Sequence, residues 1–166
     1  MYSNIMDLNQ LTAISPIDGR YRKQVQQLDE YFSEYALMKY RVIVEVEYFL
    51  FLEEKKFFKL DAKTKQHLQK TAEEFSLADA EEIKKTESIT NHDVKAVEYF
   101  IKKVLDNCDS GHLKEWVHFG LTSQDINNTA IPLLWKNSIE LEYLPAVINL
   151  QHAIGNMALA WKDIPM

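Results

Sequence analysis

The stretch from His118 to Thr129 holds residue types and spacings that can bind a small anion. It contains Gly120, the hydroxyl residues Thr122 and Ser123, and the acid Asp125. The Thr122-x-x-Asp125 spacing is typical of a helix start, where a hydroxyl caps free N–H groups and an acid lies in the first turn. Free N–H groups at this positive end of a helix also bind anions. The spacing therefore predicts a capped helix start, which can serve as an anion site or simply begin a helix.

A second group of reactive side chains lies in the run from Ser15 to Tyr21. Its proline, aspartate and glycine lie close together and predict a turn. The turn places Arg20 next to Tyr21, and the planar guanidinium of arginine suits a phosphate or a carboxylate. The same run also fits a surface turn with a solvated arginine.

The run from Thr90 to Asp93 repeats the hydroxyl-x-x-acid spacing. We therefore expect Thr90 to cap a helix, with Asn91 and His92 at its start, where they can face a cavity. Histidine titrates near neutral pH and suits proton transfer, but a lone histidine at a helix start also serves as a structural hydrogen-bonding group. Both uses of His92 fit the sequence.

The sequence offers no pattern for a metal or an organic cofactor, and we expect none. His92 and Asp93 are adjacent, so they point to different faces of a helix and make a poor pair of metal ligands. No two histidines have the i, i+4 spacing of a zinc site. Cys108 is the only cysteine and lies among acids, which would raise the pKa of a thiol.

Helices must position these groups, because the sequence has a helical period almost throughout. A helix from about Ser33 to Lys55 is apolar around most of its circumference and must be buried on several sides or meet another subunit. Asp61 caps a more polar helix that ends near Phe75, and a Ser76-x-x-Asp79 box opens another through about Ser88. The next helix has a buried apolar stripe, formed by Val94, Val97, Ile101, Val104 and Leu105.

Beyond the Thr122 cap, two helical segments are predicted at residues 123 to about 142 and 145 to about 162. Pro145 fits the first position of the second segment. Pro132 falls inside the first segment, where the missing N–H should kink or split the helix. No strand-like alternation longer than a few residues occurs, so the predicted fold class is all-α. We expect a helical N-terminal domain at residues 1–121 and the first leg of a long-helix bundle at residues 122–166.

The composition fits a soluble globular protein. Of 166 residues, 46% are hydrophobic and 27% are charged, and the four glycines and four prolines leave little room for linkers. A net charge of −6 argues against DNA or RNA as a partner. The most apolar run, Tyr40 to Leu52, carries three charged residues, which argues against a membrane span. The single cysteine and the absence of a signal-like pattern in Met1 to Gln10 point to the cytoplasm.

Four blocks of residues, in order and in register, closely resemble the N-terminal part of the bacterial adenylosuccinate lyase family. The blocks are Ser15-Pro16-x-Asp18-Gly19-Arg20-Tyr21, Phe32-Ser33-Glu34-Tyr35, Thr90 to Phe100, and His118-Phe119-x-x-Thr122-Ser123-x-Asp125-Ile126-Asn127-Asn128. Members of this aspartase and fumarase superfamily are all-helical homotetramers whose active sites combine several subunits. The resemblance implies a β-elimination that releases fumarate from adenylosuccinate to give AMP, and from the imidazole carboxamide counterpart SAICAR to give AICAR, in purine biosynthesis.

The resemblance also implies roles for seven substrate-binding residues. Arg20 and Tyr21 match the pair that meets the nucleotide, with Arg20 as the phosphate partner. Thr122 and Ser123 match the hydroxyls that hold the succinyl end of the substrate. Asn91, His92 and Asp93 match the substrate-binding helix start, and His92 is similar to a histidine that orients the leaving-group side.

The match covers only the first part of the family pattern. In the family, a general-acid histidine follows a segment like Asp163-Ile164-Pro165, and a later mobile loop carries the serine that removes the proton. Neither segment is in these 166 residues. We therefore expect no catalytic acid or base in this chain, which alone should be inactive and not natively tetrameric.

Two other readings fit parts of the sequence. Another fumarate-releasing lyase, such as argininosuccinate lyase, or a fumarase, shares the Thr-Ser-x-Asp pattern, but the Arg20-Tyr21 block and the run from Thr90 to Asp93 favour the purine enzyme. A non-catalytic helical scaffold could assemble through the apolar helix near residues 35 to 52. The scaffold would bind neither nucleotide nor fumarate.

Overall fold

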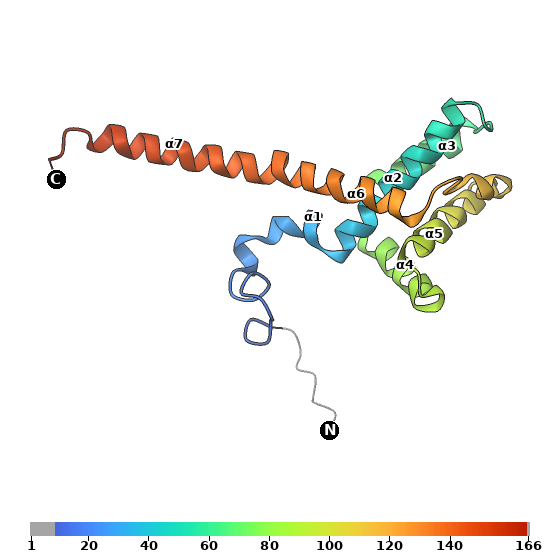
Figure 1. Cartoon of the computed structure of the whole chain (residues 1–166), viewed down its shortest axis with the longest axis horizontal. Coiled ribbons are helices and arrows are strands. Elements are labelled where there is room, and N and C mark those ends of the chain that lie inside the picture. The colour runs from blue at the N-terminus through green and yellow to red at the C-terminus, as the bar shows by residue number, and fades with distance from the viewer. Residues whose placement is uncertain (1–8, 166) are drawn as a thin grey trace, which may run out of the picture.

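The computed structural model describes residues 9–165, and every regular element in that range is helical (Figure 1). This confirms the all-α class. The expectation about a signal peptide falls mostly on residues 1–8, outside the described range. The α-helices are α1 (Asp29–Phe32), α2 (Glu34–Glu54), α3 (Ala62–Glu73), α4 (Leu77–Thr90), α5 (Asp93–Asn107), α6 (Ser123–Ser138) and α7 (Leu144–Trp161). Shorter elements are η1 (Arg22–Gln24), η2 (Gln26–Leu28), η3 (Gly111–Trp116) and the π-helical turn η4 (Ile139–Tyr143).

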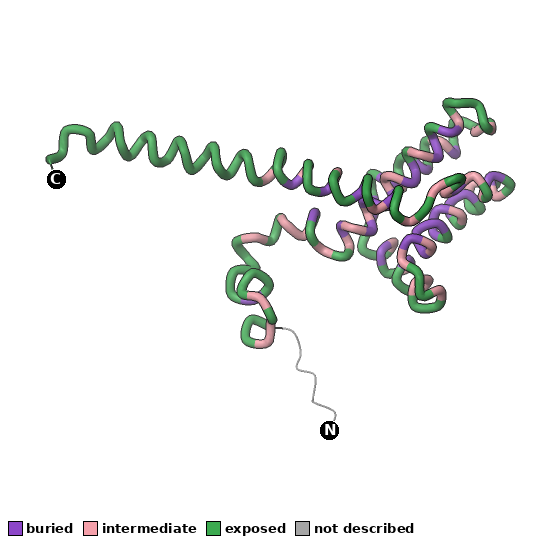
Figure 2. The backbone as a smooth tube through the Cα atoms, in the orientation of Figure 1, coloured by how far each residue is buried: buried purple, intermediate pink, exposed green. Residues whose placement is uncertain are grey.

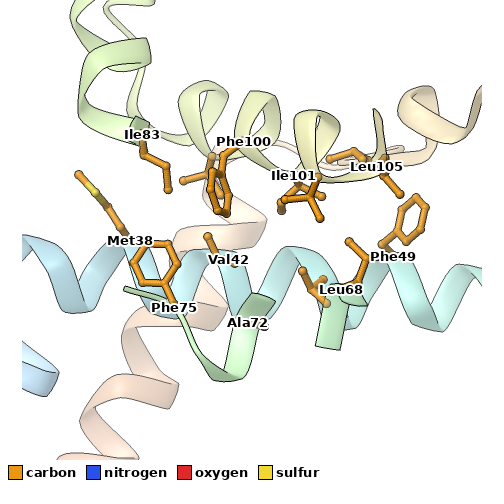
Figure 3. Close-up of a cluster of buried hydrophobic side chains, with 14 of the residues drawn as sticks. Met38, Val42, Phe49, Leu68, Ala72, Phe75, Ile83, Phe100, Ile101 and Leu105 are labelled. Carbon is orange, nitrogen blue, oxygen red and sulfur yellow. The ribbon is translucent and has the colours of Figure 1, made fainter. Parts of the chain in front are cut away.

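Helix α2 is the centre of the fold. It contacts α3, α4, α5 and α6, which confirms that a helix apolar on most sides is buried on several of them. Val42, Val46 and Phe49 of α2 are almost fully buried and pack with Leu68 of α3 and Ile101 of α5 (Figure 3). Since α2 supports both α5 and α6, it fixes where the two candidate helix starts lie.

Local capping chemistry explains most helix boundaries. Ser33 accepts a hydrogen bond from the Ala36 N–H at the start of α2, and Asp61 accepts one from the Thr64 N–H at the start of α3. Ser76 begins α4 with the capping box that the sequence predicts. Each cap satisfies N–H groups that have no partner within the helix.

The predicted cap at Thr90 is wrong. Thr90 is the last residue of α4, where its hydroxyl donates to the Thr86 carbonyl at 3.1 Å, one turn back along the same helix. Asn91 then adopts a left-handed conformation with φ of 51°, which ends α4. His92 is the N-cap of α5 instead, because its Nδ1 accepts from the Lys95 N–H at 3.2 Å.

Helices α6 and α7 form one continuous rod through η4 (Figure 1). The predicted split at Pro132 is wrong, since α6 passes through it. Pro132 and Asn128 are both exposed, so water can reach the carbonyl that the proline leaves without an N–H partner. The irregular turn instead lies directly before Pro145, where the wider π-helical geometry avoids a clash between the proline ring and the preceding turn.

No residue of α7 is buried (Figure 2). Its exposed apolar side chains include Val147, Ile148, Leu150, Ile154, Met157 and Leu159. Soluble proteins rarely leave such a continuous apolar surface uncovered, so this surface is typical of one that packs on other helices. Between residues 9 and 165, no helix combines the length and the apolar character needed to cross a membrane.

Candidate functional site

A buried arginine joins the starts of α5 and α6. Arg41 of α2 has only 6% of its surface exposed. Its Nη2 donates to Asp93 Oδ2 at 2.6 Å, and its Nε donates to Asn127 Oδ1 at 2.9 Å. Asp93 is the first residue of α5, and Asn127 lies in the second turn of α6. Two of the predicted regions, distant in sequence, are therefore neighbours in the structure.

The start of α6 has the predicted capping box. The Asp125 carboxylate accepts from the Thr122 N–H at 2.7 Å and from the Thr122 hydroxyl at 2.8 Å. These hydrogen bonds from Thr122 lower the pKa of Asp125 and keep it ionised. The hydroxyl proton of Thr122 is thus committed to Asp125, and Thr122 serves mainly to hold the loop against the helix.

Ser123 is the free hydroxyl of this helix start. It is the first residue of α6 and is half-buried. Its hydroxyl makes no hydrogen bond to any other residue in the described part of the chain. The first N–H groups of a helix also lack partners within the helix. Ser123 can therefore donate to an incoming carboxylate together with the N–H groups of the same turn.

The start of α5 presents His92 to solvent. Nδ1 of His92 is occupied by the Lys95 N–H, so a neutral ring must carry its proton on Nε2. About half of the His92 side-chain surface is exposed. The ring can therefore offer one N–H donor to a ligand while its other nitrogen caps the helix.

The other two residues of this run have different surroundings. Burial acts to raise the pKa of Asp93, but the Val94 N–H and the Arg41 guanidinium more than offset it and hold this pKa below its usual value. Asp93 is therefore ionised at neutral pH. Asn91 borders a cavity of about 290 Å³ with Lys84, Glu87 and Ser88 of α4, and His92 does not line it.

The loop before α6 rests on a buried carboxylate. His118 has a left-handed backbone with φ of 61°, and its Nδ1 is hydrogen-bonded to the Glu45 side chain. Its Nε2 lies 3.9 Å from Glu98, which in turn accepts from Lys95 at 2.7 Å. Gly120 also has a positive φ, of 71°, which glycine adopts without strain. His118 thus supports this loop through its hydrogen bond to Glu45.

Glu45 makes the stability of the fold depend on pH. Its side chain has no exposed surface and Oε2 has no partner, so desolvation raises its pKa, and the hydrogen bond from His118 only partly offsets this. A carboxyl whose pKa is higher in the folded protein than in the unfolded protein holds its proton more tightly in the folded state. Its contribution to the stability of the fold is fully present below the unfolded-state pKa and is lost as the pH rises through the folded-state pKa. The raised pKa of Glu45 therefore makes the protein less stable at neutral pH than it would be with an unshifted carboxyl.

We expect Glu45→Gln to relieve this cost. Burying a neutral amide costs less than burying a charge, and the amide oxygen can still accept from His118. The variant should gain about 1 kcal/mol, or several degrees in Tm, at about pH 8, with the gain shrinking toward about pH 5. Calorimetry across that range would measure it, with Glu47→Gln, an exposed position on the same helix, as the control. Equal shifts for the two variants would contradict the prediction.

Arg20 and Tyr21 lie in the predicted turn, where the Gly19 N–H donates to Ser15 and the Tyr21 N–H donates to Pro16. The Arg20 guanidinium lies 5.5 Å from the centre of the Tyr21 ring. In residues 9–165, no ion pair engages Arg20. The turn lies at the N-terminal end of the molecule, away from α5 (Figure 1), and within residues 9–165 neither side chain has a hydrogen bond or an ion pair to the starts of α5 or α6. The structure therefore links the start of α5 to α6 through Asp93, Arg41 and Asn127, and this link does not include Arg20 or Tyr21.

Arg41 and Glu45 contribute to the site but are not among the residues predicted from the sequence. In the sequence they stand out only as charges in an apolar run, which argue against a membrane span. They are four residues apart, so they lie on one face of α2, and both are buried. Two opposite charges on one face of an otherwise apolar helix were the available signal, since a buried charge needs a partner elsewhere in the fold.

No group of three or more histidine, cysteine, aspartate or glutamate residues in the described range could hold a metal ion. The site offers instead hydroxyl, imidazole and main-chain N–H donors at two helix starts. Such a set can bind carboxylates and stabilise developing negative charge.

Comparison with known proteins identifies the family. A family model described as lyase matches residues 19–166. The chain is 50% identical to an adenylosuccinate lyase of Dictyostelium discoideum, 42% identical to one of Vibrio cholerae and 41% identical to one of Escherichia coli. Each match covers 97% of this chain and 36% of the relative, so the chain spans about a third of the length of these relatives. The chain belongs to the lyase family.

Proposed function

We propose that the full-length protein containing this chain is an adenylosuccinate lyase. It eliminates fumarate from adenylosuccinate to give AMP, and from SAICAR to give AICAR. The pairing of two helix starts by Arg41, with the free Ser123 hydroxyl beside them, is the observation that supports this proposal most strongly. The identity of 38–50% to enzymes of that name also supports it.

The substrate-binding residues divide by chemistry. Ser123 and the first N–H groups of α6 hold a succinyl carboxylate, and Thr122 keeps that helix start in shape. His92 donates from Nε2 toward the leaving-group side, with Asn91 and Asp93 beside it. Arg20 and Tyr21 meet the nucleotide, with the guanidinium as phosphate partner.

β-Elimination needs a base, an acid and donors for the charge that develops in the transition state. This chain supplies the donors. We propose that the acid and the base lie in the part of the full-length protein beyond these 166 residues, so that the chain alone turns over no substrate. The chemistry requires neither a metal nor an organic cofactor.

The assembly is part of the same proposal. Residues 1–121 form the N-terminal domain, and residues 122–166 form the first leg of a helical bundle in a cytoplasmic homotetramer. The uncovered apolar side chains of α7 support this, since bundle helices bury such surfaces against one another. The net charge of −6 argues against a nucleic-acid partner.

Ultraviolet absorbance of adenylosuccinate mixed with the full-length protein tests the proposal. We expect conversion to AMP and fumarate, with argininosuccinate and malate unchanged under the same conditions. Conversion of either control in place of adenylosuccinate would assign another member of the superfamily. A folded full-length protein that binds neither AMP nor fumarate in calorimetry would favour the helical scaffold.

A further inference from the structure

We infer that Arg41 is a positioning residue for the proposed lyase reaction, which sets the starts of α5 and α6 in register by binding Asp93 and Asn127 simultaneously. This inference rests on the proposed function for its kinetic part. Arg41 does not itself face the substrate in this arrangement, because it is buried between α2 and the two helices.

The two hydrogen bonds of Arg41 depend on the planar shape of its guanidinium. Nε and Nη2 donate to acceptors on two different helices, at 2.9 Å and 2.6 Å. A planar guanidinium presents these donors at a fixed angle, so the two acceptors cannot move independently. A lysine keeps the charge but has a single flexible ammonium, and cannot reproduce the two fixed directions.

The two acceptors lie next to the proposed ligand groups. Asp93 directly follows His92, and Asn127 lies one turn beyond Ser123 on α6. A shift of either helix start would move His92 relative to Ser123, and these residues hold opposite ends of the bond to be broken. Misplacement by about 1 Å can cost about a hundredfold in rate.

The ion pair between Arg41 and Asp93 differs from an ordinary surface ion pair because Arg41 is buried. Only 7% of its side chain is exposed, whereas 46% of the Asp93 side chain is exposed. A buried cation must be paired, so Arg41 holds Asp93 and Asn127 in every folded molecule. Asp93 then acts mainly through Arg41, and its carboxylate is not free to form an ion pair with a ligand cation.

Tyr40 provides a matched control. It neighbours Arg41 on α2, is 5% exposed, and its hydroxyl accepts a hydrogen bond from Asn137 on α6 at 2.9 Å. Tyr40→Phe therefore removes a buried polar link between the same two helices. That link lies far along α6 from Ser123, so its loss affects stability and leaves the helix starts in place.

The experiment compares Arg41→Lys, Asn127→Ala and Tyr40→Phe in the full-length protein, with kcat, KM and Tm measured for each. We expect Arg41→Lys and Asn127→Ala to lower kcat at least tenfold with a smaller change in KM, because the helix starts lose their relative placement. Their effects should be less than additive in the double variant, since both remove the same contact. Tyr40→Phe should lower Tm and leave kcat and KM near the wild-type values.

Wild-type kcat and KM in both site variants, with only Tm lowered, would overturn the inference. If Arg41→Lys fails to fold, Asn127→Ala alone tests the positioning role, because it removes one hydrogen bond of Arg41 and leaves the ion pair between Arg41 and Asp93 in place.

Hydrogen exchange separates this inference from the proposed function, because it needs no substrate. Arg41→Lys should speed exchange at residues 93–97 and 123–128 together, and Tyr40→Phe should not. Unchanged exchange at both helix starts would overturn the positioning role. Faster exchange in a protein inactive on adenylosuccinate would retain that role and reject the proposed substrate.

Discussion

Phe49→Ala is expected to lower the free energy of unfolding by about 3–5 kcal/mol, the range typical of a phenylalanine removed from a packed core. Phe49 is 1% exposed, and the centroid of its ring lies 4.6 Å from the centroid of the Phe58 ring. It belongs to the cluster through which α2 holds α3 and α5 (Figure 3). Because a domain has only about 5–15 kcal/mol of stability in total, the variant should be partly unfolded at moderate urea. Urea titration followed by far-ultraviolet circular dichroism measures the loss.

Phe51→Ala is the matched control for this prediction. Phe51 lies on the same helix but is 48% exposed, so the substitution removes the same atoms without leaving a buried cavity. Its cost should be about 1 kcal/mol or less. Similar losses for the two variants would mean that α2 is not buried on the side that faces α3 and α5.

Local chemistry made the helices predictable from the sequence. Asp61 and Ser76 cap helices as the sequence predicts, because an N-cap needs only the following three residues, and α2 begins at the predicted position next to Ser33. Thr90 shows the limit of this reasoning. Its hydroxyl can also bond one turn back, and Asn91 tolerates the left-handed conformation that ends α4. Two local solutions compete there, and the spacing alone does not choose between them.

The two prolines of the rod show a second limit. A proline in a helix costs most where the carbonyl that it leaves without a partner is buried, and burial depends on the fold. Pro132 lies on an exposed face, whereas a π-helical turn precedes Pro145. The sequence predicts that a proline perturbs a helix, but it cannot tell which of the two is accommodated.

The candidate site could be predicted in pieces but not as an assembly. The start of α6 has a local signature, so the predicted capping box of Thr122 and Asp125 is confirmed, whereas the same signature at Thr90 is wrong. The link between the helix starts is tertiary. Arg41 is 52 residues from Asp93 and 86 from Asn127, and no local pattern joins such positions. A buried charge in an apolar helix signals that a partner exists, and only the fold identifies it.

Ser123→Ala in the full-length protein is expected to lower kcat/KM for adenylosuccinate at least tenfold, or about 1.4 kcal/mol. The loss could reach about 4 kcal/mol if the hydroxyl bonds more strongly to the transition state than to the ground state. The reason is structural: Ser123 is the half-buried first residue of α6, and its hydroxyl has no partner within residues 9–165. Initial rates from ultraviolet absorbance over a range of substrate concentrations would separate kcat from KM.

Two further variants determine whether the Ser123 hydroxyl itself is responsible. Ser123→Thr keeps a hydroxyl at the first position of α6 and should retain much more activity than Ser123→Ala. Thr71→Ala removes a hydroxyl that donates to the His67 carbonyl within α3, a helix that carries none of the candidate residues, and should leave the rate unchanged. If Ser123→Ala keeps the wild-type rate, the carboxylate is held by the main-chain N–H groups of α6 alone, because those donors remain in the variant. The hydroxyl would then be a helix-start residue without a role in binding.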